Sequence, residues 1–151
     1  MIEHKEGDIF TVESGIIMHG CNTLGVMGAG VAKTMREKYP RVYKGYNKFC
    51  GAAAEDRESL VGTVHFHRVT LGLIIANAFT QLDPGPDATL YAIRQCLVRV
   101  MQFGRENGMP VNSVMIGAGI GGLKWEDVYE TYVSVDAFFP ETSLIIWKYK
   151  P

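Results

Sequence analysis

The sequence predicts an α/β fold, in which helices cover both faces of a sheet, from two glycine-rich segments and their surroundings. One segment spans residues 20–30 and the other spans residues 117–122. Each follows a short apolar run, at residues 15–19 and 114–116, and each leads into a helical pattern. Strands that alternate with helices are typical of sheets covered on both faces, whose ligands bind at the carboxyl ends of the strands. Both glycine-rich segments fall at such ends.

The first half of the chain alternates β-rich runs with two helical segments. Gly7 and Asp8 form a turn signal after the first run. Pro40 ends one helix and opens the next, because proline is tolerated only in the first turn of a helix. The elements expected here are strands at residues 1–5 and 15–19, helices at 29–39 and 40–49, and strands at 61–68 and 71–76.

The second half contains the strongest helical pattern, at residues 88–107. Apolar side chains recur there at three- and four-residue spacing, Asp87 is expected to cap the helix at its start, and Gly108 is expected to end it. The remaining expected elements are a strand at residues 114–116, a helix that begins near Trp125, and a strand at 144–147.

Bulk properties exclude several classes of function. With 151 residues, 47% of them hydrophobic, the chain is expected to form a single domain over residues 1–151. The net charge of −1 gives no electrostatic case for nucleic acid or a membrane surface as the main partner. No apolar run approaches the roughly 18 residues of a membrane helix, and no signal peptide is recognisable.

The cysteine and histidine residues predict neither disulfides nor a metal. Cys21, Cys50 and Cys96 are odd in number and scattered, which favours the reducing cytoplasm. His65 and His67 point the same way on a strand but have no third ligand, so they are expected to be surface residues. We expect no metal and no cofactor.

The glycine-rich segments match no nucleotide-binding motif in full. Gly117, Gly119 and Gly122 fit G-x-G-x-x-G, but the chain that follows has room for only one helix and one strand. In the first segment Ala32 precedes Lys33, where a P-loop requires glycine. Glycine loops still aim backbone N–H groups at phosphates. The presence of two such loops predicts a phosphate compound bound between them, most simply a diphosphate. The alternative is that the glycines serve tight packing without a ligand.

Three stretches resemble the macro domain family: residues 7–9 (Gly-Asp-Ile), residues 19–32 with His-Gly-Cys-Asn and Met-Gly-Ala-Gly-Val-Ala, and residues 116–125. The resemblance extends over essentially the whole chain, in the correct order and spacing. It implies a three-layer α/β/α fold with a mixed central sheet. It also implies that the ligand is ADP-ribose or a derivative of it, bound across the strand ends, with ADP-ribosylated macromolecules as further partners.

The resemblance assigns the adenine end of this site to residues near the two chain termini. Asp8 would accept a hydrogen bond from the adenine amino group, and the Ile9 backbone would help to fix the base. Trp147 and Tyr149 share one face of the last strand. Either would pack on the adenine; the alternative is core packing for Trp147 and surface exposure for Tyr149.

The rest of the ligand falls to the glycine-rich segments. Asn22 would hydrogen-bond the hydroxyl groups of the distal ribose, since its amide both donates and accepts. The backbone donors expected around the diphosphate are those of Gly117, Gly119, Ile120, Gly121, Gly122 and Leu123. The residues expected to close over the distal ribose and its neighbouring phosphate are Gly28, Ala29, Gly30, Val31 and Ala32.

The candidate catalytic residues are His19, Asn22 and Asp83. His19 matches a histidine of the phosphatase-like branch of the family and would transfer a proton; a buried, hydrogen-bonded histidine is the alternative. Asp83 would act as a base toward the attacking water, or is a solvated turn residue. Cys21 has no evident base partner, so a nucleophilic role is not expected.

Two departures from the related glycohydrolases direct the choice of reaction. Residues 75–81 contain no lysine, and Gly121 stands where some of those enzymes carry aspartate. The favoured activity is therefore hydrolysis of ADP-ribose 1''-phosphate to ADP-ribose and phosphate. The alternatives are removal of ADP-ribose from modified targets, and a non-catalytic module that recognises such targets.

Overall fold

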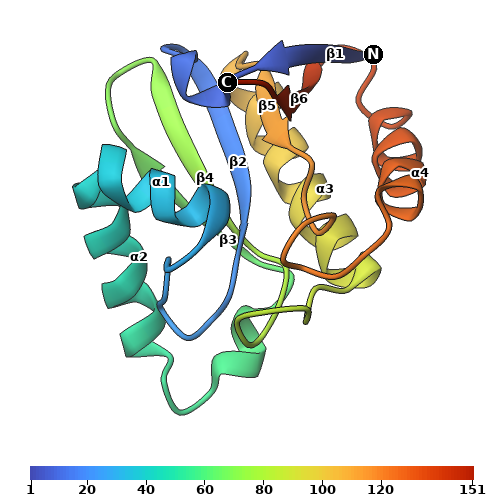
Figure 1. The fold of residues 1–151 in the computed structure, drawn as a ribbon. Helices are drawn as coiled ribbons and strands as arrows, with labels where there is room; N and C mark the ends of the chain where they lie inside the picture. Colours follow the sequence, from blue (N-terminus) through green and yellow to red (C-terminus); the bar gives the residue numbers. More distant parts are fainter.

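The computed structural model describes residues 1–151 and contains six strands and four α-helices (Figure 1). In chain order the elements are β1 (Ile2–Gly7), η1 (Ile9–Thr11), β2 (Gly15–Cys21), α1 (Gly30–Lys38), α2 (Pro40–Ala52), η2 (Arg57–Leu60), β3 (Val64–Arg68), β4 (Leu73–Phe79), α3 (Leu90–Asn107), β5 (Val111–Val114), α4 (Trp125–Asp136) and β6 (Leu144–Tyr149), where η denotes a short 3₁₀ helix.

The six strands form one mixed sheet in the order β1-β6-β5-β2-β4-β3. Only the pairing of β3 with β4 is antiparallel, and all other neighbours are parallel. β2 lies inside the sheet between β4 and β5, and its side chains are packed on both faces. This burial explains why residues 15–18 form an apolar run, because strands buried on both faces do not alternate polar and apolar residues.

Helices cover both faces of the sheet, which confirms the predicted three-layer α/β/α arrangement (Figure 1). Ile16 and Met18 of β2 belong to a core cluster with residues of α3 and α4. Ile17, which points to the other face, belongs to a second cluster with Met35 of α1 and Tyr46 of α2. No helix is both long and apolar enough to span a membrane.

The start of α3 differs from the prediction. Thr89 is the N-cap, and its hydroxyl accepts a hydrogen bond from the Ala92 N–H at 3.1 Å. The Asp87 carboxylate instead accepts from the N–H groups of Leu82 and Asp83 and closes the preceding loop. The expected end of the helix is confirmed, because Gly108 adopts the left-handed conformation with φ 62°.

The position of β5 is also corrected. The strand spans Val111–Val114, whereas the apolar run predicted a strand at residues 114–116. Asn112 and Ser113 are buried despite their polarity because the protein satisfies them: Asn112 Nδ2 donates to the Ile16 carbonyl, and the Ser113 hydroxyl pairs with that of Tyr132. Buried polar residues that are hydrogen-bonded in this way interrupt the apolar pattern, so the pattern did not predict this strand.

Candidate functional site

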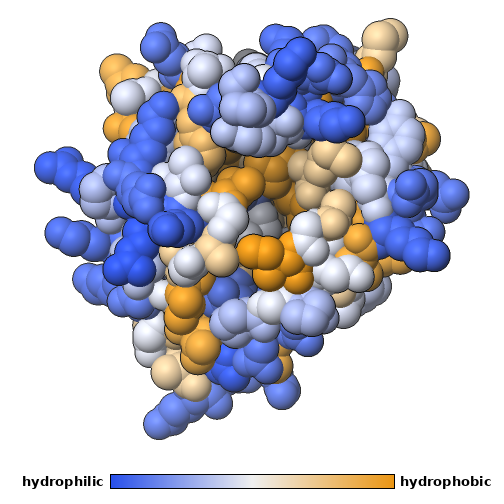
Figure 2. All heavy atoms as spheres, in the orientation of Figure 1, coloured by the Kyte–Doolittle hydropathy of each residue, from blue (hydrophilic) through white to orange (hydrophobic).

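A cleft of about 790 Å³ lies at the carboxyl ends of the central parallel strands. Figure 2 shows a hollow near the middle of this face with apolar side chains at its rim and hydrophilic ones farther out. Loop 1 (residues 20–30) and loop 2 (residues 117–122) both line it. Of the predicted site residues, the cleft is lined by Asp8, Ile9, His19, Asn22, Gly28, Ala29, Gly30, Val31, Ala32, Gly117, Gly119, Ile120, Gly121, Trp147 and Tyr149. Asp83, Gly122 and Leu123 are not part of the lining.

Loop 2 presents five free backbone donors. The N–H groups of residues 117–121, which include the predicted donors Gly117, Gly119, Ile120 and Gly121, have no partner within the protein. Those of Gly122 and Leu123 donate to carbonyl groups of the loop itself. For these last two residues the expected contact with a diphosphate therefore does not fit the geometry, whereas the five unpartnered N–H groups match an anion-binding loop.

Loop 1 ends in a helix whose first turn is uncapped. Ala29 is the N-cap of α1 and supplies no side-chain acceptor, and no backbone N–H of residues 28–32 has a partner in the protein. Such N–H groups, together with the positive end of the helix dipole, form an anion-binding site. The two loops approach each other closely: a Cβ atom on Gly30 would lie 3.3 Å from Ile120 Cδ1.

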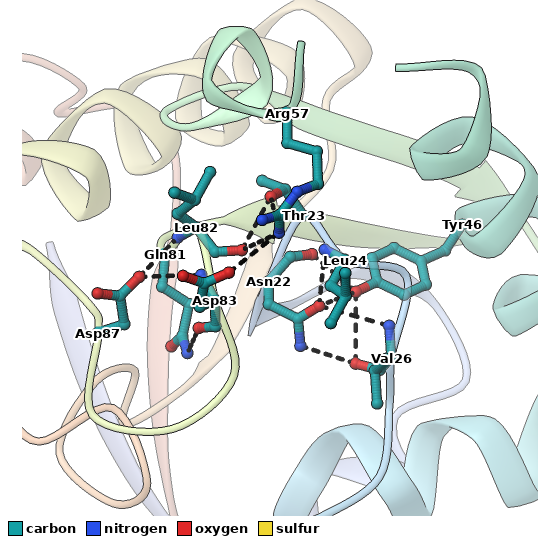
Figure 3. A network of polar contacts seen from close by, with 10 residues as sticks. All are labelled: Asn22, Thr23, Leu24, Val26, Tyr46, Arg57, Gln81, Leu82, Asp83 and Asp87. Atoms are coloured by element: carbon teal, nitrogen blue, oxygen red, sulfur yellow. Dashed lines mark hydrogen bonds and ion pairs between the residues drawn. The ribbon is translucent and has the colours of Figure 1, made fainter. Parts of the chain in front are cut away.

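The Asn22 side chain holds loop 1 in its conformation (Figure 3). Its Oδ1 accepts from the Leu24 N–H at 3.1 Å, and its Nδ2 donates to the Val26 carbonyl at 2.8 Å. The Tyr46 hydroxyl of α2 donates to the Asn22 carbonyl at 2.7 Å. The amide expected to hold the ribose is thus already engaged at both ends. Tyr46 was not predicted, since its helical spacing indicates only a core residue.

Asp8 stands at the opposite end of the cleft, at the end of β1. Its Oδ1 accepts from the Phe10 N–H at 2.9 Å, which caps η1, and the other carboxylate oxygen has no partner in the protein. Asp8 is exposed, and the neighbouring Ile9 is buried beneath it. The free oxygen can accept a hydrogen bond from an exocyclic amino group.

The two aromatic residues of β6 have different surroundings. Trp147 is half-buried; its indole N–H donates to Asn112 Oδ1 at 2.9 Å, and Lys5 Nζ lies 5.4 Å from its ring centre. Tyr149 is 71% exposed at the rim of the cleft. Trp147 packs partly inside the protein and Tyr149 is exposed, as the second alternative expected; both residues line the cleft, and packing on the adenine stays a prediction.

His19 lies at the floor of the cleft and is almost fully buried. One ring nitrogen, Nε2, is 2.6 Å from Asn77 Oδ1. Burial lowers the pKa of the imidazole to about 4, although the hydrogen bond to Asn77 acts in the opposite direction. The ring is therefore neutral at pH 7.

Cys21 has the imidazole neighbour that the sequence failed to indicate. Its Sγ lies 3.5 Å from Nε2 of His19, because residues two apart on β2 share one face of the sheet. The expectation that Cys21 lacks a basic partner was wrong. Burial nevertheless raises the pKa of this thiol well above its ordinary value, so the pair does not form a thiolate nucleophile.

Asp83 lies beside the cleft in an ion pair with Arg57 of η2, with Nη1 and Oδ1 3.1 Å apart (Figure 3). Arg57 also reaches the Leu82 carbonyl at 3.4 Å and the Thr23 hydroxyl at 3.5 Å. The residues after Asp83, Pro84 and Gly85, do line the cleft. The carboxylate must turn away from Arg57 to act on a bound ligand. No sequence motif indicated Arg57.

The family model that describes the macro domain matches residues 18–132. This match covers most of the chain, including loop 1 and loop 2. The chain belongs to the macro domain family.

Among its relatives, this macro domain is 27% identical to a protein named DNA ADP-ribosyl glycohydrolase from Mycobacterium tuberculosis, over 97% of the chain but only 42% of that protein. It is 28% identical to the ADP-ribose 1''-phosphate phosphatase of Candida albicans, over 84% of the chain and 88% of the relative. Among solved structures, the macrodomain of Mycobacterium tuberculosis DarG superposes with a TM-score of 0.85 at 28% identity and covers 97% of each chain. The chain thus spans less than half of the mycobacterial glycohydrolase.

The cleft of this macro domain contains no lysine or arginine. Asp8 is its one carboxylate residue. His65 and His67 on β3 are half-buried, which corrects their expected surface location, and no group of three histidine, cysteine, aspartate or glutamate residues could hold a metal ion. Charge in a bound ligand would therefore be met by backbone dipoles.

Proposed function

We propose that residues 1–151 form a single macro domain that binds ADP-ribose and hydrolyses ADP-ribose 1''-phosphate to ADP-ribose and phosphate. One observation carries this proposal: loop 2 and the start of α1 line the same cleft, and each presents backbone N–H groups that have no hydrogen-bond partner. A diphosphate between them would satisfy both sets. The phosphatase from Candida albicans, similar along most of the chain, supports the reaction.

The size of the cleft favours a nucleoside diphosphate sugar over a simple phosphate. Asp8 offers a free carboxylate oxygen at one end, and Asn22 lies at the other. The 790 Å³ volume is within the usual range for small-molecule sites. Adenine would be selected by Asp8, the diphosphate by the backbone donors, and the distal ribose by contacts at loop 1.

For hydrolysis, water would attack the terminal phosphorus, and the bond from phosphorus to the ribose oxygen would break. His19 would accept a proton from this water and pass it to the departing ribose oxygen, and Asp83 would assist after leaving Arg57. A base whose pKa is about 4 is weak at pH 7, so slow turnover is expected. Phosphoryl charge would be stabilised by the N–H groups at the start of α1.

The second candidate function is removal or recognition of ADP-ribose on modified targets. The similarity to the mycobacterial glycohydrolase along 97% of the chain favours removal. The engagement of Asn22, His19 and Asp83 within the protein favours recognition without turnover. We also infer a cytoplasmic location, which three buried, unpaired cysteines support.

Binding is tested by titration calorimetry with ADP-ribose on the native protein and on Asp8→Asn. Loss of a charged acceptor is expected to weaken binding about ten- to a hundredfold, since hydrogen bonds to charged groups contribute about 1.5–3 kcal/mol. Glu6→Gln is the matched control, because Glu6 precedes the same turn but does not line the cleft. Equal affinity of all three proteins would refute the adenine role of Asp8.

The reaction is tested by supplying ADP-ribose 1''-phosphate, ADP-ribosylated protein and ADP-ribosylated DNA in parallel. Phosphate release that disappears in the His19→Ala, Asn22→Ala double variant supports the phosphatase. Release of ADP-ribose from protein or DNA instead supports the glycohydrolase. Binding of ADP-ribose with no turnover on any substrate supports the recognition module.

A further inference from the structure

A row of three polar side chains crosses the sheet from the cleft to its β3 edge. His19 of β2 is the register partner of Asn77 on β4, and Asn77 is the partner of His65 on β3. Because partnered residues of neighbouring strands point to the same face, the three side chains lie next to one another. His19 lines the cleft, Asn77 is fully buried, and His65 is half-buried.

Hydrogen bonds connect the three side chains directly. Asn77 Oδ1 lies 2.6 Å from Nε2 of His19, and Asn77 Nδ2 lies 3.2 Å from Nδ1 of His65. The carbonyl end of the amide can only accept, and the NH₂ end can only donate. His19 must therefore carry its hydrogen on Nε2, and His65 must leave Nδ1 unprotonated.

This arrangement couples the tautomers of two distant imidazoles. If the Asn77 amide turned over, its NH₂ group would face His19, which would then need an unprotonated Nε2. Its carbonyl would face His65, which would then need a hydrogen on Nδ1. The two neutral rings consequently carry their hydrogen either both on Nε2 or both on Nδ1.

The side chains are placed as in the first of these two states. Asn77 and His19 are shielded from water, so any state with an unpaired donor or acceptor at either would cost about 1–3 kcal/mol, which restricts the row to the two paired states. The Cys21 thiol, 3.9 Å from Asn77 Oδ1, also faces the carbonyl end of the amide. The His65 ring packs against Phe49 with centroids 4.8 Å apart, which holds the acceptor in place.

We propose that Asn77 and His65 are positioning residues that fix the tautomer of His19 and leave its Nδ1, which lies 3.9 Å from Cys21 Sγ, unprotonated and able to accept a proton. The catalytic part of this inference rests on the proposed function. The tautomer itself is a property of the free protein and does not depend on any substrate. Neither positioning residue was among the predicted site residues, since neither belongs to a glycine-rich loop.

The first test reads the tautomer by ¹⁵N–¹H imidazole spectroscopy of the ligand-free protein. The native protein is expected to show the Nε2–H form of His19. His65→Leu removes the acceptor and is expected to populate the Nδ1–H form, whereas His65→Asn places an oxygen near the former Nδ1 and is expected to retain Nε2–H. A native Nδ1–H form, or one tautomer shared by all three proteins, would overturn the proposal.

The second test measures phosphate release from ADP-ribose 1''-phosphate. His65→Leu is expected to lower kcat about ten- to a hundredfold with KM unchanged. This loss is smaller than the whole rate enhancement of roughly 10²–10⁴-fold that general acid–base catalysis supplies, because His19 itself remains. His65→Asn should restore kcat. His67→Leu is the control, because His67 lies on the same strand face without bonding to Asn77. An equal loss in both leucine variants would overturn the positioning role.

The two tests separate failure of this inference from failure of the proposed function. If the native protein releases no phosphate, the phosphatase proposal is wrong, and the tautomer measurement alone decides whether the row couples His65 to His19. If the protein releases phosphate but the His19 tautomer does not respond to His65→Leu, the phosphatase stands and the positioning role is wrong.

Discussion

Loop 1 and loop 2 both present backbone N–H groups to the cleft, but they are held in different ways. Loop 1 is held by side chains: Asn22 bonds the loop backbone, Tyr46 bonds Asn22, and Asn47 Nδ2 donates to the Gly25 carbonyl at 3.1 Å. Loop 2 is held by close packing of its own backbone. A Cβ atom on Gly121 would lie 2.8 Å from the Cα atom of Gly117.

The difference implies different responses to mutation. Hydrogen bonds from side chains can be removed one at a time, at a cost of about 0.5–1.5 kcal/mol each. A backbone packed to contact has no space for an added methyl group, so a single atom displaces the whole loop. Loop 1 should therefore loosen gradually, whereas loop 2 should tolerate a change at one position and fail at another.

The largest expected effect is in loop 2, from Gly122→Ala. The added Cβ would lie 2.7 Å from Cβ of Pro86, and the residue has φ +82°. Overpacking together with left-handed strain is expected to cost about 2–5 kcal/mol. The free energy of unfolding by urea measures this loss.

Gly119→Ala is the matched control for this prediction. A Cβ atom on Gly119 meets nothing within 4 Å, and the residue is not in the left-handed region. Its free energy of unfolding should stay close to that of the native protein. If the two alanine variants were equally stable, close packing would not be what holds loop 2.

The second prediction concerns the loss of stability at acid pH, which we expect from His19 at the start of loop 1. His19 has a pKa lowered to about 4 by burial, whereas an unfolded histidine titrates near 6.5. Between these values the unfolded chain binds a proton that the folded protein excludes, so stability falls as pH decreases through this window. The expected loss is about 3 kcal/mol. His65, whose pKa is also lowered mainly by burial, adds a loss of the same sign.

Urea unfolding at several pH values between 7 and 4 checks this dependence. His19→Gln should reduce the slope, because glutamine does not titrate. Hydrogen exchange should accelerate in loop 1 before loop 2, since His19 lies at the end of the strand that leads into loop 1. An identical slope in the native protein and the variant would show that His19 is not the group responsible.

The third prediction compares two buried tyrosine hydroxyls. Tyr46→Phe and Tyr132→Phe each remove one buried hydroxyl that is hydrogen-bonded, to Asn22 and to Ser113 respectively. Each is expected to lower the free energy of unfolding by about 1–2 kcal/mol. Only Tyr46→Phe should weaken ADP-ribose binding, because only it releases loop 1. Equal binding by both variants would contradict the side-chain support of this loop.

The same contrast explains how much of the molecule could be predicted from its sequence. Glycines indicate where the backbone adopts conformations or close approaches that other residues do not allow. Both loops, the end of α3 at Gly108 and the α/β fold were therefore predictable. The supports of loop 1 were not, because Tyr46 carries only the spacing of a core residue. Asn77 likewise lies within an apolar run, and its role depends on which strands pair across the sheet.

Competing hydrogen-bond partners also explain what the sequence did not reveal about residues 81–89. Asp87 was expected to cap α3 because aspartate before a helical pattern usually does so. Thr89, two residues later, was the better-placed acceptor, and Asp87 closes the loop at Leu82. The pairing of Asp83 with Arg57 joins residues 26 positions apart, which no local pattern encodes.

The smallest expected effect is at the contact that connects loop 1 to the neighbouring segment of residues 81–87. Arg57→Gln removes the ion pair with Asp83, whose side chain is 56% exposed, so the loss of stability should stay below about 1 kcal/mol. Lys150→Gln, which removes the exposed pair with Glu6, is the control and should change stability even less. Thr23 still bonds the Leu82 carbonyl through its N–H and its hydroxyl, so loop 1 should keep its place. A large loss of ADP-ribose affinity in Arg57→Gln would mean that loop 1 depends on a charge as well as on the hydrogen bonds of Asn22.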